Sequence, residues 1–328
     1  MNPKKLIKLV ISLLMLALVV RVVDLQRFVA VLRSIPPLAV VTVVIGYALG
    51  QLLSAWKWWL IARASNIPSS LGNAIRAYFI GMYVNCFGFG IVGGDLTRGV
   101  MLAGAEGPKA KALATVVADR AHGLAVLAFL GTCSAALLGS GASGLDPLFR
   151  WLLAFIAMGV AVGWIAGPKL IVRLCKPDSK LGYIARDVSD AFPRNPRSML
   201  AVTLISVAFH ILQIALHAAM AWAVSAPIPM TVLLIAIPFV NILSSLPISW
   251  QGLGVRENAY AFFLVPAYLS YEQTLAFGAI WLLAVTASSA IGGVVSVMSS
   301  GTTLVVTERL EPNHSAPNPA TPATGTSL

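Results

Sequence analysis

The sequence predicts an all-α integral membrane protein with about six transmembrane helices and two re-entrant helical hairpins. Of its 328 residues, 58% are hydrophobic and only 11% are charged, whereas about a quarter of the residues in an average soluble domain are charged. No charged residue occurs in 77–94, 121–145 or 273–307. Because about 20 apolar residues cross a bilayer as a helix, these stretches are long enough to span. A water-soluble globular fold is therefore excluded.

The first predicted helix, 6–23, contains an apolar run, 9–20, that follows three lysines and resembles a signal peptide, but no small-x-small cleavage site comes after it. We predict an uncleaved first helix. Further full spans are predicted at 38–62, 112–139, 148–168, 199–225 and 273–300. The tail 301–328 is rich in Thr, Pro, Ala and Asn and is predicted to be disordered. Residues 1–300 are thus predicted to form a single membrane domain.

Charge predicts the orientation of the connections. Residues 169–198 hold the largest basic cluster, and cytoplasmic loops carry an excess of Lys and Arg. If every long run crossed once from a cytoplasmic N-terminus, this loop would lie outside. The conflict disappears if 73–96 enters and leaves on the same side. The net charge of +11 is then explained by basic cytoplasmic loops and not by a nucleic-acid-binding surface. We predict a protein of the bacterial cytoplasmic membrane with both termini in the cytoplasm.

The composition of 73–96 agrees with a re-entrant hairpin. Asn85 and several glycines, among them Gly93 and Gly94, interrupt the apolar run. Broken backbone is tolerated at membrane depth only where protein or a water-filled cavity satisfies its polar groups. We expect the side chain of Asn85 to satisfy such groups at the tip of the hairpin.

A second hairpin is predicted at 231–269, entering from outside. Its apolar run breaks at Asn241 and again around Gly252 and Gly254, before a run too short to span. Asn241 is expected to have the same role as the asparagine of the first hairpin. In both segments an apolar run is followed by an asparagine, by glycines, by charged residues and then by a long helix. An inverted-topology repeat would give this order. The likeness between the two segments is one of spacing and not of residue identity. In transporters, such paired interruptions mark the binding site.

The second hairpin also carries an isolated charged pair. Arg256 and Glu257 are the only charged residues between Arg197 and Glu272. An ionisable group inside a membrane costs about 2.5–3.5 kcal/mol on insertion scales, which makes a functional role the default hypothesis. The alternative is an ion pair in a loop at the membrane interface.

Two further charged pairs belong to the first half. Asp95 and Arg98 share a helix face, and they follow two glycines at a predicted helix N-terminus, whose amides could bind an anion; alternatively, Asp95 caps that helix. Asp119 and Arg120 point in different directions because they are adjacent on a helix. Each therefore needs another partner, and the charged residues of the hairpins are the candidates. A purely structural cross-helix bridge is the alternative.

Other polar residues favour structural roles. His210, Gln213 and His217 recur on one helix face, where interhelical hydrogen bonding is favoured over a metal site. The stretch 56–59, Trp-Lys-Trp-Trp, is interpreted as an interfacial aromatic belt. Gly46 and Gly50 form a GxxxG helix-packing surface. No metal site and no cofactor are predicted.

Three strings together carry a family resemblance: Gly93-Gly94-Asp95-Leu-Thr-Arg98, Asp119-Arg120, and Gly252-Leu-Gly-Val-Arg256-Glu257. From about residue 5 to residue 300 the chain resembles the family that includes the membrane flippase domain of bacterial lysylphosphatidylglycerol synthases. The resemblance implies a multi-helix domain that moves lipids, often anionic or aminoacylated phospholipids, between leaflets. The soluble aminoacyl-transferase domain of the full synthases is lacking, so lipid aminoacylation is not expected.

The leading hypothesis is therefore a lipid translocase, gradient-driven or passive because no ATP-binding motif is present. Three arginines would hold the headgroup phosphate, since guanidinium groups suit phosphate oxygens: Arg98, Arg120 and Arg256. Three acids would balance charge, contact an amino headgroup or take up a coupling proton: Asp95, Asp119 and Glu257. The alternatives are a membrane enzyme that transfers a group to a lipid-linked acceptor, and a scaffold for a lipid-synthesis partner. Membrane lipids are the expected partners; the lipid, its direction and the oligomeric state stay open.

Overall fold

The computed structural model describes residue 17 and residues 23–298, except 89, 106, 143–146, 176–178, 194, 247–248 and 250. The predicted first helix at 6–23 and the predicted tail therefore lie outside the described residues, apart from residues 17 and 23. The regular elements are α2 (Leu25–Ser34), α3 (Pro37–Ala64), α4 (Leu71–Phe87), α5 (Gly90–Ala103), α6 (Lys109–Ala142), α7 (Pro147–Leu174), α8 (Lys180–Ala191), α9 (Pro196–Ala223), α10 (Met230–Ser245), α11 (Val255–Leu264) and α12 (Tyr271–Met298). The described part of the chain contains helices and no strands, which confirms the all-α class.

Four helices are long and apolar enough to cross a membrane: α3, α6, α9 and α12. They coincide with predicted spans, and α7 forms the helix expected at 148–168. Sequence signals set the ends of the long helices. α3 and α9 both begin with a proline, which suits the first turn because its missing N–H has no partner there anyway. An all-helical integral membrane protein is thus confirmed.

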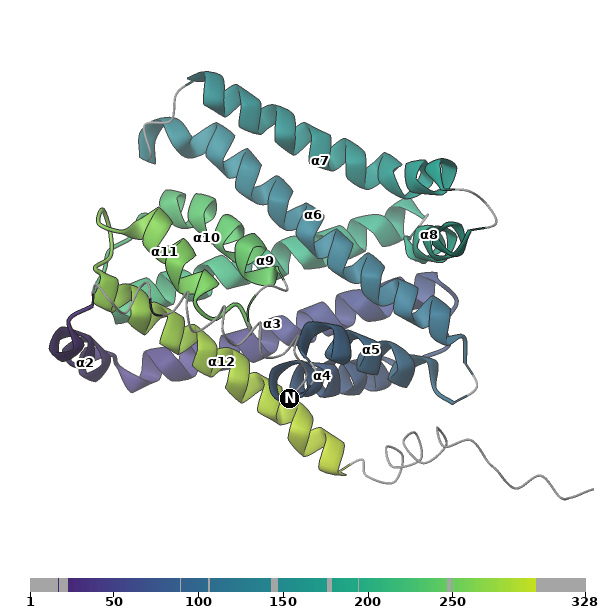
Figure 1. The fold of residues 1–328 in the computed structure, drawn as a ribbon, viewed down its shortest axis with the longest axis horizontal. Coiled ribbons are helices and arrows are strands. Elements are labelled where there is room, and N and C mark those ends of the chain that lie inside the picture. The colour runs from purple at the N-terminus through teal and green to yellow at the C-terminus, as the bar shows by residue number, and fades with distance from the viewer. Residues whose placement is uncertain are drawn as a thin grey trace, which may run out of the picture.

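The two predicted hairpins are pairs of short helices (Figure 1). α4 packs against α5, and α10 packs against α11. The returning helices have 14 and 10 residues, or about 21 and 15 Å at 1.5 Å per residue, less than the ~30 Å of a bilayer core. Helical backbone continues through Asn85 and Asn241, and turns follow at Gly88 and at 251–254. The expected breaks at the two asparagines were wrong because residue propensity is a weak prior in a packed helix.

The helices repeat in a long–short–short–long order. α3, α4, α5 and α6 form one set, and α9, α10, α11 and α12 form the other. In Figure 1, α3 runs from the end of the molecule near α2 to the end near α8, whereas α9 runs the opposite way. The contacts exchange accordingly: α6 packs on α10 as α12 packs on α4, and α5 packs on α6 as α11 packs on α12.

Glycines mark equivalent helix crossings in the two sets. A Cβ on Gly131 of α6 would meet the Pro238 side chain of α10, and a Cβ on Gly292 of α12 would meet the backbone of Phe79 in α4. Pro238 and Phe79 are both the ninth residue of their short helix, counted from Met230 and from Leu71. The two sets of helices therefore share their order and these helix crossings.

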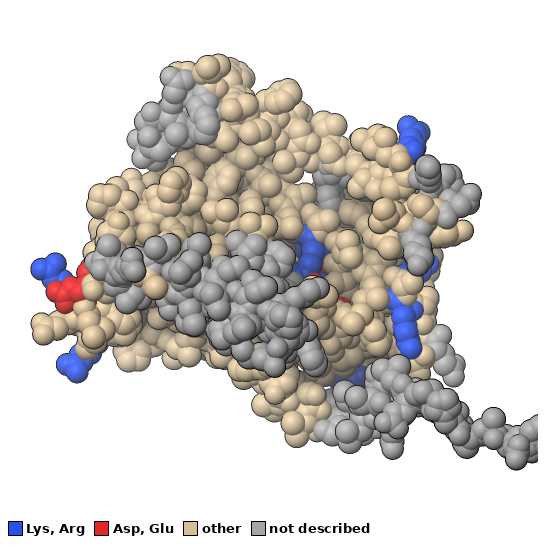
Figure 2. All heavy atoms as spheres, viewed as in Figure 1, with Lys and Arg blue, Asp and Glu red and all other residues tan. Residues whose placement is uncertain are grey.

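Charge is distributed as a membrane requires. On the face drawn in Figure 2, charged side chains gather at the two ends of the molecule, uncharged residues cover most of the described surface between them, and a basic group is visible near the middle. The central group matters because an exposed charge between the ends stands within the apolar layer, where it is costly.

Candidate functional site

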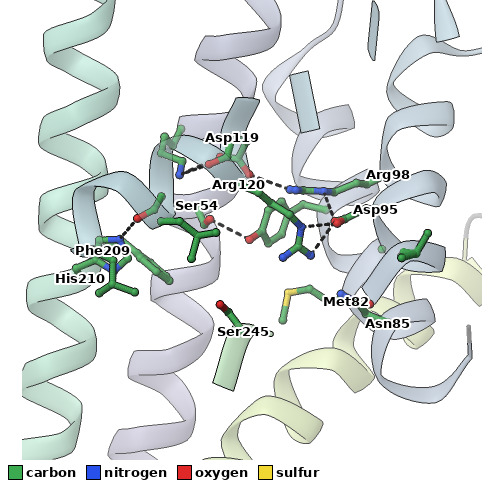
Figure 3. Close-up of a pocket in the computed structure, with 18 residues that line it drawn as sticks. Ser54, Met82, Asn85, Asp95, Arg98, Asp119, Arg120, Phe209, His210 and Ser245 are labelled. Atoms are coloured by element: carbon green, nitrogen blue, oxygen red, sulfur yellow. Dashed lines mark hydrogen bonds and ion pairs between the residues drawn. The ribbon is translucent and has the colours of Figure 1, made fainter. Parts of the chain in front are cut away.

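A cavity of about 410 Å³ lies among α3, α4, α5, α6, α9 and the end of α10. Its lining includes three cations and two carboxylates, which gives it a formal charge of +1 with His210 neutral. Figure 3 shows these side chains converging from different helices. The charged residues are Lys57, Asp95, Arg98, Asp119 and Arg120.

The inner part of the site is an ion triad around Asp119. Its Oδ1 lies 3.0 Å from Lys57 Nζ and its Oδ2 lies 3.2 Å from Arg98 Nη1. All three side chains are at most 7% exposed. Lys57 also donates to the backbone carbonyl of Asp119 at 3.2 Å. Since removing one member of a buried ion pair is strongly destabilising, these three groups hold α3, α5 and α6 together.

The outer part of the site is centred on Asp95. Arg98 Nε lies 3.2 Å from Asp95 Oδ1. Arg120 binds the same carboxylate with two nitrogens: Nη2 donates to Oδ1 at 2.8 Å and Nε donates to Oδ2. The Arg120 side chain is 41% exposed, against 19% for Asp95. Positive and negative groups therefore alternate from Lys57 at the buried end to Arg120 at the open end.

Aromatic rings fix the central arginine. The guanidinium carbon of Arg98 lies 5.0 Å from the ring centres of both Trp58 and Tyr78, within the range of cation–π attraction. Tyr78 is anchored because its hydroxyl donates to Ser54 Oγ at 2.9 Å. Arg98 is thus held by two carboxylates and two rings, and it is a fixed part of the site.

Two polar groups on the cavity lining have no hydrogen-bond partner within the described structure. His210 donates from Nε2 to the Gly123 carbonyl at 3.1 Å, which leaves Nδ1 as an unpaired acceptor. Asn85 Oδ1 is likewise buried without a partner. Buried polar groups are nearly always hydrogen-bonded. These two atoms therefore indicate positions at which a bound molecule could supply the missing partner.

The glycines of the first motif act by packing. A Cβ on Gly94 would meet the carbonyl oxygen of Gly81, and one on Gly81 would lie 2.8 Å from that of Gly94, so α4 and α5 approach closely at this crossing. Helix α5 begins at Gly90, which places Gly93 and Gly94 inside it. The expectation of a helix N-terminus at these glycines, with its amides facing an anion or capped by Asp95, was wrong.

Arg256 and Glu257 do not line this cavity. Glu257 Oε2 accepts a 2.6 Å hydrogen bond from the backbone N–H of Gly254 and so caps α11. Arg256 donates from Nη2 to the Gln251 carbonyl at 3.1 Å. Among the described residues the two form no ion pair with each other, because neighbouring residues on a helix point apart. The structure therefore separates this pair from the other four predicted charges.

The turns of the two hairpins meet. Gln251 Nε2 donates to the backbone carbonyl of Asn85 at 3.0 Å. The strained backbone lies on the second hairpin, where φ is 53° at Gln251, 74° at Gly252 and 80° at Gly254, values that glycine adopts readily. Asn85 thus contacts the opposite hairpin through its backbone. Asn241 is half-buried within α10.

The sequence interpretation missed Lys57. It was placed in an aromatic belt, yet it is buried and ion-paired, and Trp58 beside it is fully buried. The periodic face of α9 was interpreted correctly: His210 and His217 both make interhelical hydrogen bonds, the latter to Tyr260 at 2.7 Å. The expected packing surface at 46–50 is also confirmed, since both of its glycines face side chains of α9.

No curated protein matches the sequence. The model of the family described as the lysylphosphatidylglycerol synthase TM region matches residues 5–293. That match covers the hairpins, the cavity and all three strings that carried the resemblance. The chain therefore belongs to the lysylphosphatidylglycerol synthase TM region family.

Proposed function

We propose that the protein is a lipid translocase that moves an anionic or amino phospholipid, or a related lipid, between leaflets. The observation that carries this proposal is the make-up of the cavity. Its inner wall is charged, whereas Val92 and Leu124 on its lining are 72% and 43% exposed. Exposed apolar residues on a membrane protein face acyl chains. A headgroup could therefore enter the charged region while its chains stay in the bilayer.

The proposed orientation places the end of the molecule near α8 in the cytoplasm. Exposed basic residues gather at the helix ends there, in accordance with the positive-inside rule: Arg63, Lys109, Arg173 and Arg197. On this orientation α4 and α5 re-enter from the cytoplasm, α10 and α11 re-enter from outside, and both termini are cytoplasmic in a bacterial inner membrane.

We further propose that the two halves form an inverted repeat that exposes the cavity to one leaflet at a time, the usual logic of transporters built in this way. The exchanged helix contacts and the equivalent glycine crossings support this arrangement. The Gln251–Asn85 hydrogen bond joins the two re-entrant turns. It is the contact that we expect to break when the halves move apart, driven by a gradient or by thermal motion alone.

Transport is favoured over group transfer by the state of the acids. Asp95 and Asp119 are each held by two cations, and Glu257 caps a helix. A general base must be free to contact a substrate and to accept its proton, whereas each of these carboxylates is already engaged by groups of the protein. None of these three acids is therefore suited to that role, and we propose that the protein is not an enzyme.

The test is leaflet exchange of fluorescent phospholipids in proteoliposomes with matched protein content. Arg120→Gln should reduce the exchange rate about tenfold, because it removes a charged contact to the headgroup. The matched control is Arg173→Gln, at an exposed arginine near the end of α7 and away from the cavity lining. It should exchange lipid at the wild-type rate.

Wild-type vesicles that exchange no lipid faster than protein-free vesicles, with or without a proton gradient, would refute the proposal. Equal exchange rates for Arg120→Gln and wild type would be compatible with translocation but would refute the role of the cavity as the headgroup site. A scaffold role predicts that substitutions lower the folded yield and change no rate.

A further inference from the structure

The charge of the cavity bears on which headgroup it accepts, provided that the proposed function holds. Asp119 contacts Lys57 and Arg98, and Asp95 contacts Arg98 and Arg120. A headgroup ammonium would have to compete with two cations for either carboxylate, inside a cavity whose formal charge is already +1. Like charges repel strongly where the dielectric constant is low. The cavity is therefore unsuited to amino headgroups.

Arg120 is the group best placed to receive a phosphate. It is the most exposed of the five charged residues that line the cavity. Its two-point contact with Asp95 has the geometry with which guanidinium groups bind phosphate. When Arg120 turns to a phosphate, Asp95 keeps its ion pair with Arg98. The exchange therefore leaves no buried carboxylate without a cation, the situation that would be costly.

The remaining lining favours hydroxyl groups beyond the phosphate. His210 Nδ1 is an acceptor without a partner, and the side chain of Asn85 presents a second unpaired atom. A hydroxyl can donate and accept, so it satisfies Asn85 whichever way the amide is turned, and it satisfies the histidine as a donor. A headgroup without any hydrogen-bond donor would leave both atoms unpaired, at a net cost for each.

We infer that the cavity selects a lipid with one phosphate and an uncharged, hydroxyl-bearing headgroup, with Arg120 on the phosphate and with Asn85 and His210 on the hydroxyls. A phosphoglycerol headgroup has this chemistry. The inference deepens the proposed function by naming the class of lipid that the same cavity carries.

The experiment compares three fluorescent lipids with identical acyl chains in phosphatidylcholine vesicles. Phosphatidylglycerol has the phosphate and the hydroxyls, phosphatidylmethanol has the same charge without hydroxyls, and phosphatidylethanolamine adds an ammonium. Wild-type protein should exchange phosphatidylglycerol about tenfold faster than phosphatidylethanolamine, the ratio expected for one unfavourable charge contact. It should exchange phosphatidylglycerol about threefold to tenfold faster than phosphatidylmethanol, as one or two hydrogen bonds would give.

A variant tests the hydroxyl contact within a single preparation. His210→Phe should slow phosphatidylglycerol and leave phosphatidylmethanol unchanged, and because both lipids are measured on the same protein, a folding defect would lower both rates together. If neither rate falls, the contact between His210 and a hydroxyl group is refuted. If both rates fall together, as a folding defect would give, the milder Asn85→Ala repeats the comparison from the other side of the cavity, and a joint fall there too would refute hydroxyl recognition.

The outcomes separate the inference from the proposed function. Equal or faster exchange of phosphatidylethanolamine would overturn the inference while translocation stands. No exchange of any lipid would overturn the proposed function itself. Radiolabelled glycerol 3-phosphate in the outer solution tests whether the ligand is a soluble phosphate ester and not a lipid. Its uptake into vesicles without lipid exchange would show that the ligand is not a lipid. Lipid exchange without uptake supports the inference.

Discussion

The two halves of the molecule share one order of helices but differ in what fills them. In the first half, α3 to α6, five charged residues line a cavity. The second half, α9 to α12, contributes most of a hydrophobic core in which Tyr260, Phe277 and Met220 are fully buried. The single acid near this core, Glu257, caps a helix. The charged residues of the cavity are therefore concentrated in one half, while the other contributes uncharged lining residues such as His210.

This difference teaches that a common plan does not imply a common role. Both returning helices bring charged residues to an equivalent place after their glycines. Only Asp95 and Arg98 find partners on neighbouring long helices; Arg256 and Glu257 are used by the backbone around them. The same sequence pattern thus builds a charged cavity in one half and a capped, closely packed turn in the other.

The largest expected difference between the halves concerns their acids. Asp119→Leu leaves Lys57 and Arg98 buried with one carboxylate fewer and should lower the free energy of unfolding by about 3–5 kcal/mol. Glu257→Gln keeps an amide oxygen to accept from Gly254 and should cost no more than about 1.5 kcal/mol. Thermal unfolding in one detergent measures both.

A second substitution checks the cause of that loss. Lys57→Met combined with Asp119→Leu removes a cation together with its carboxylate, and Arg98 still has Asp95. The double variant should recover much of the stability that Asp119→Leu loses. If the double variant is as unstable as the single variant, charge imbalance is not the reason, and the contrast between the halves would be one of packing.

The glycine crossings should behave alike in the two halves. Gly292→Ala and Gly131→Ala place a methyl group against α4 and α10, and each should destabilise by about 1–3 kcal/mol, as is usual for overpacking. Gly159→Ala on α7 is the matched control, because a Cβ there meets nothing within 4 Å. Only one crossing being sensitive would contradict the proposed repeat.

The smallest expected effects come from two tyrosines. Tyr260→Phe loses a hydrogen bond to His217 and Tyr78→Phe loses one to Ser54, each costing about 0.5–1.5 kcal/mol of stability. Lipid exchange per folded molecule should fall only for Tyr78→Phe, because the lost hydroxyl anchors the ring that contacts Arg98. Equal exchange rates for the two variants would show that the halves contribute equally to the site.

The sequence predicted the hairpins from two signals. Glycine-rich interruptions can be recognised locally in the chain, and the side of the membrane on which the basic loop 169–198 lies follows from counting the preceding spans. It also predicted that Asp119 and Arg120 pair away from each other, and the first hairpin does supply Arg98 and Asp95. Lys57 escaped because its neighbours are tryptophans near the end of an apolar run. Its burial depends on how α3 packs against α6, which no local pattern contains.

Arg256 and Glu257 show the opposite case. Their isolation in an apolar stretch correctly marked them as unusual, but their use depends on where α11 begins. Glu257 can cap the helix only because Gly254 adopts a φ of 80° and starts it three residues earlier. The backbone conformation at Gly254 thus determines whether Glu257 is available to a ligand or caps the helix. Composition alone does not predict that conformation.

The charge count of the cavity has an electrical consequence. With three cations and two carboxylates, the empty site carries one positive charge, and a bound headgroup with one negative charge makes it neutral. Any displacement of the loaded site through the membrane field then does no electrical work. Displacement of the empty site does, at a fraction of the ~2.3 kcal/mol per charge per 100 mV that the full field supplies. The membrane potential would therefore act on the return of the empty carrier and leave the passage of the lipid unaffected.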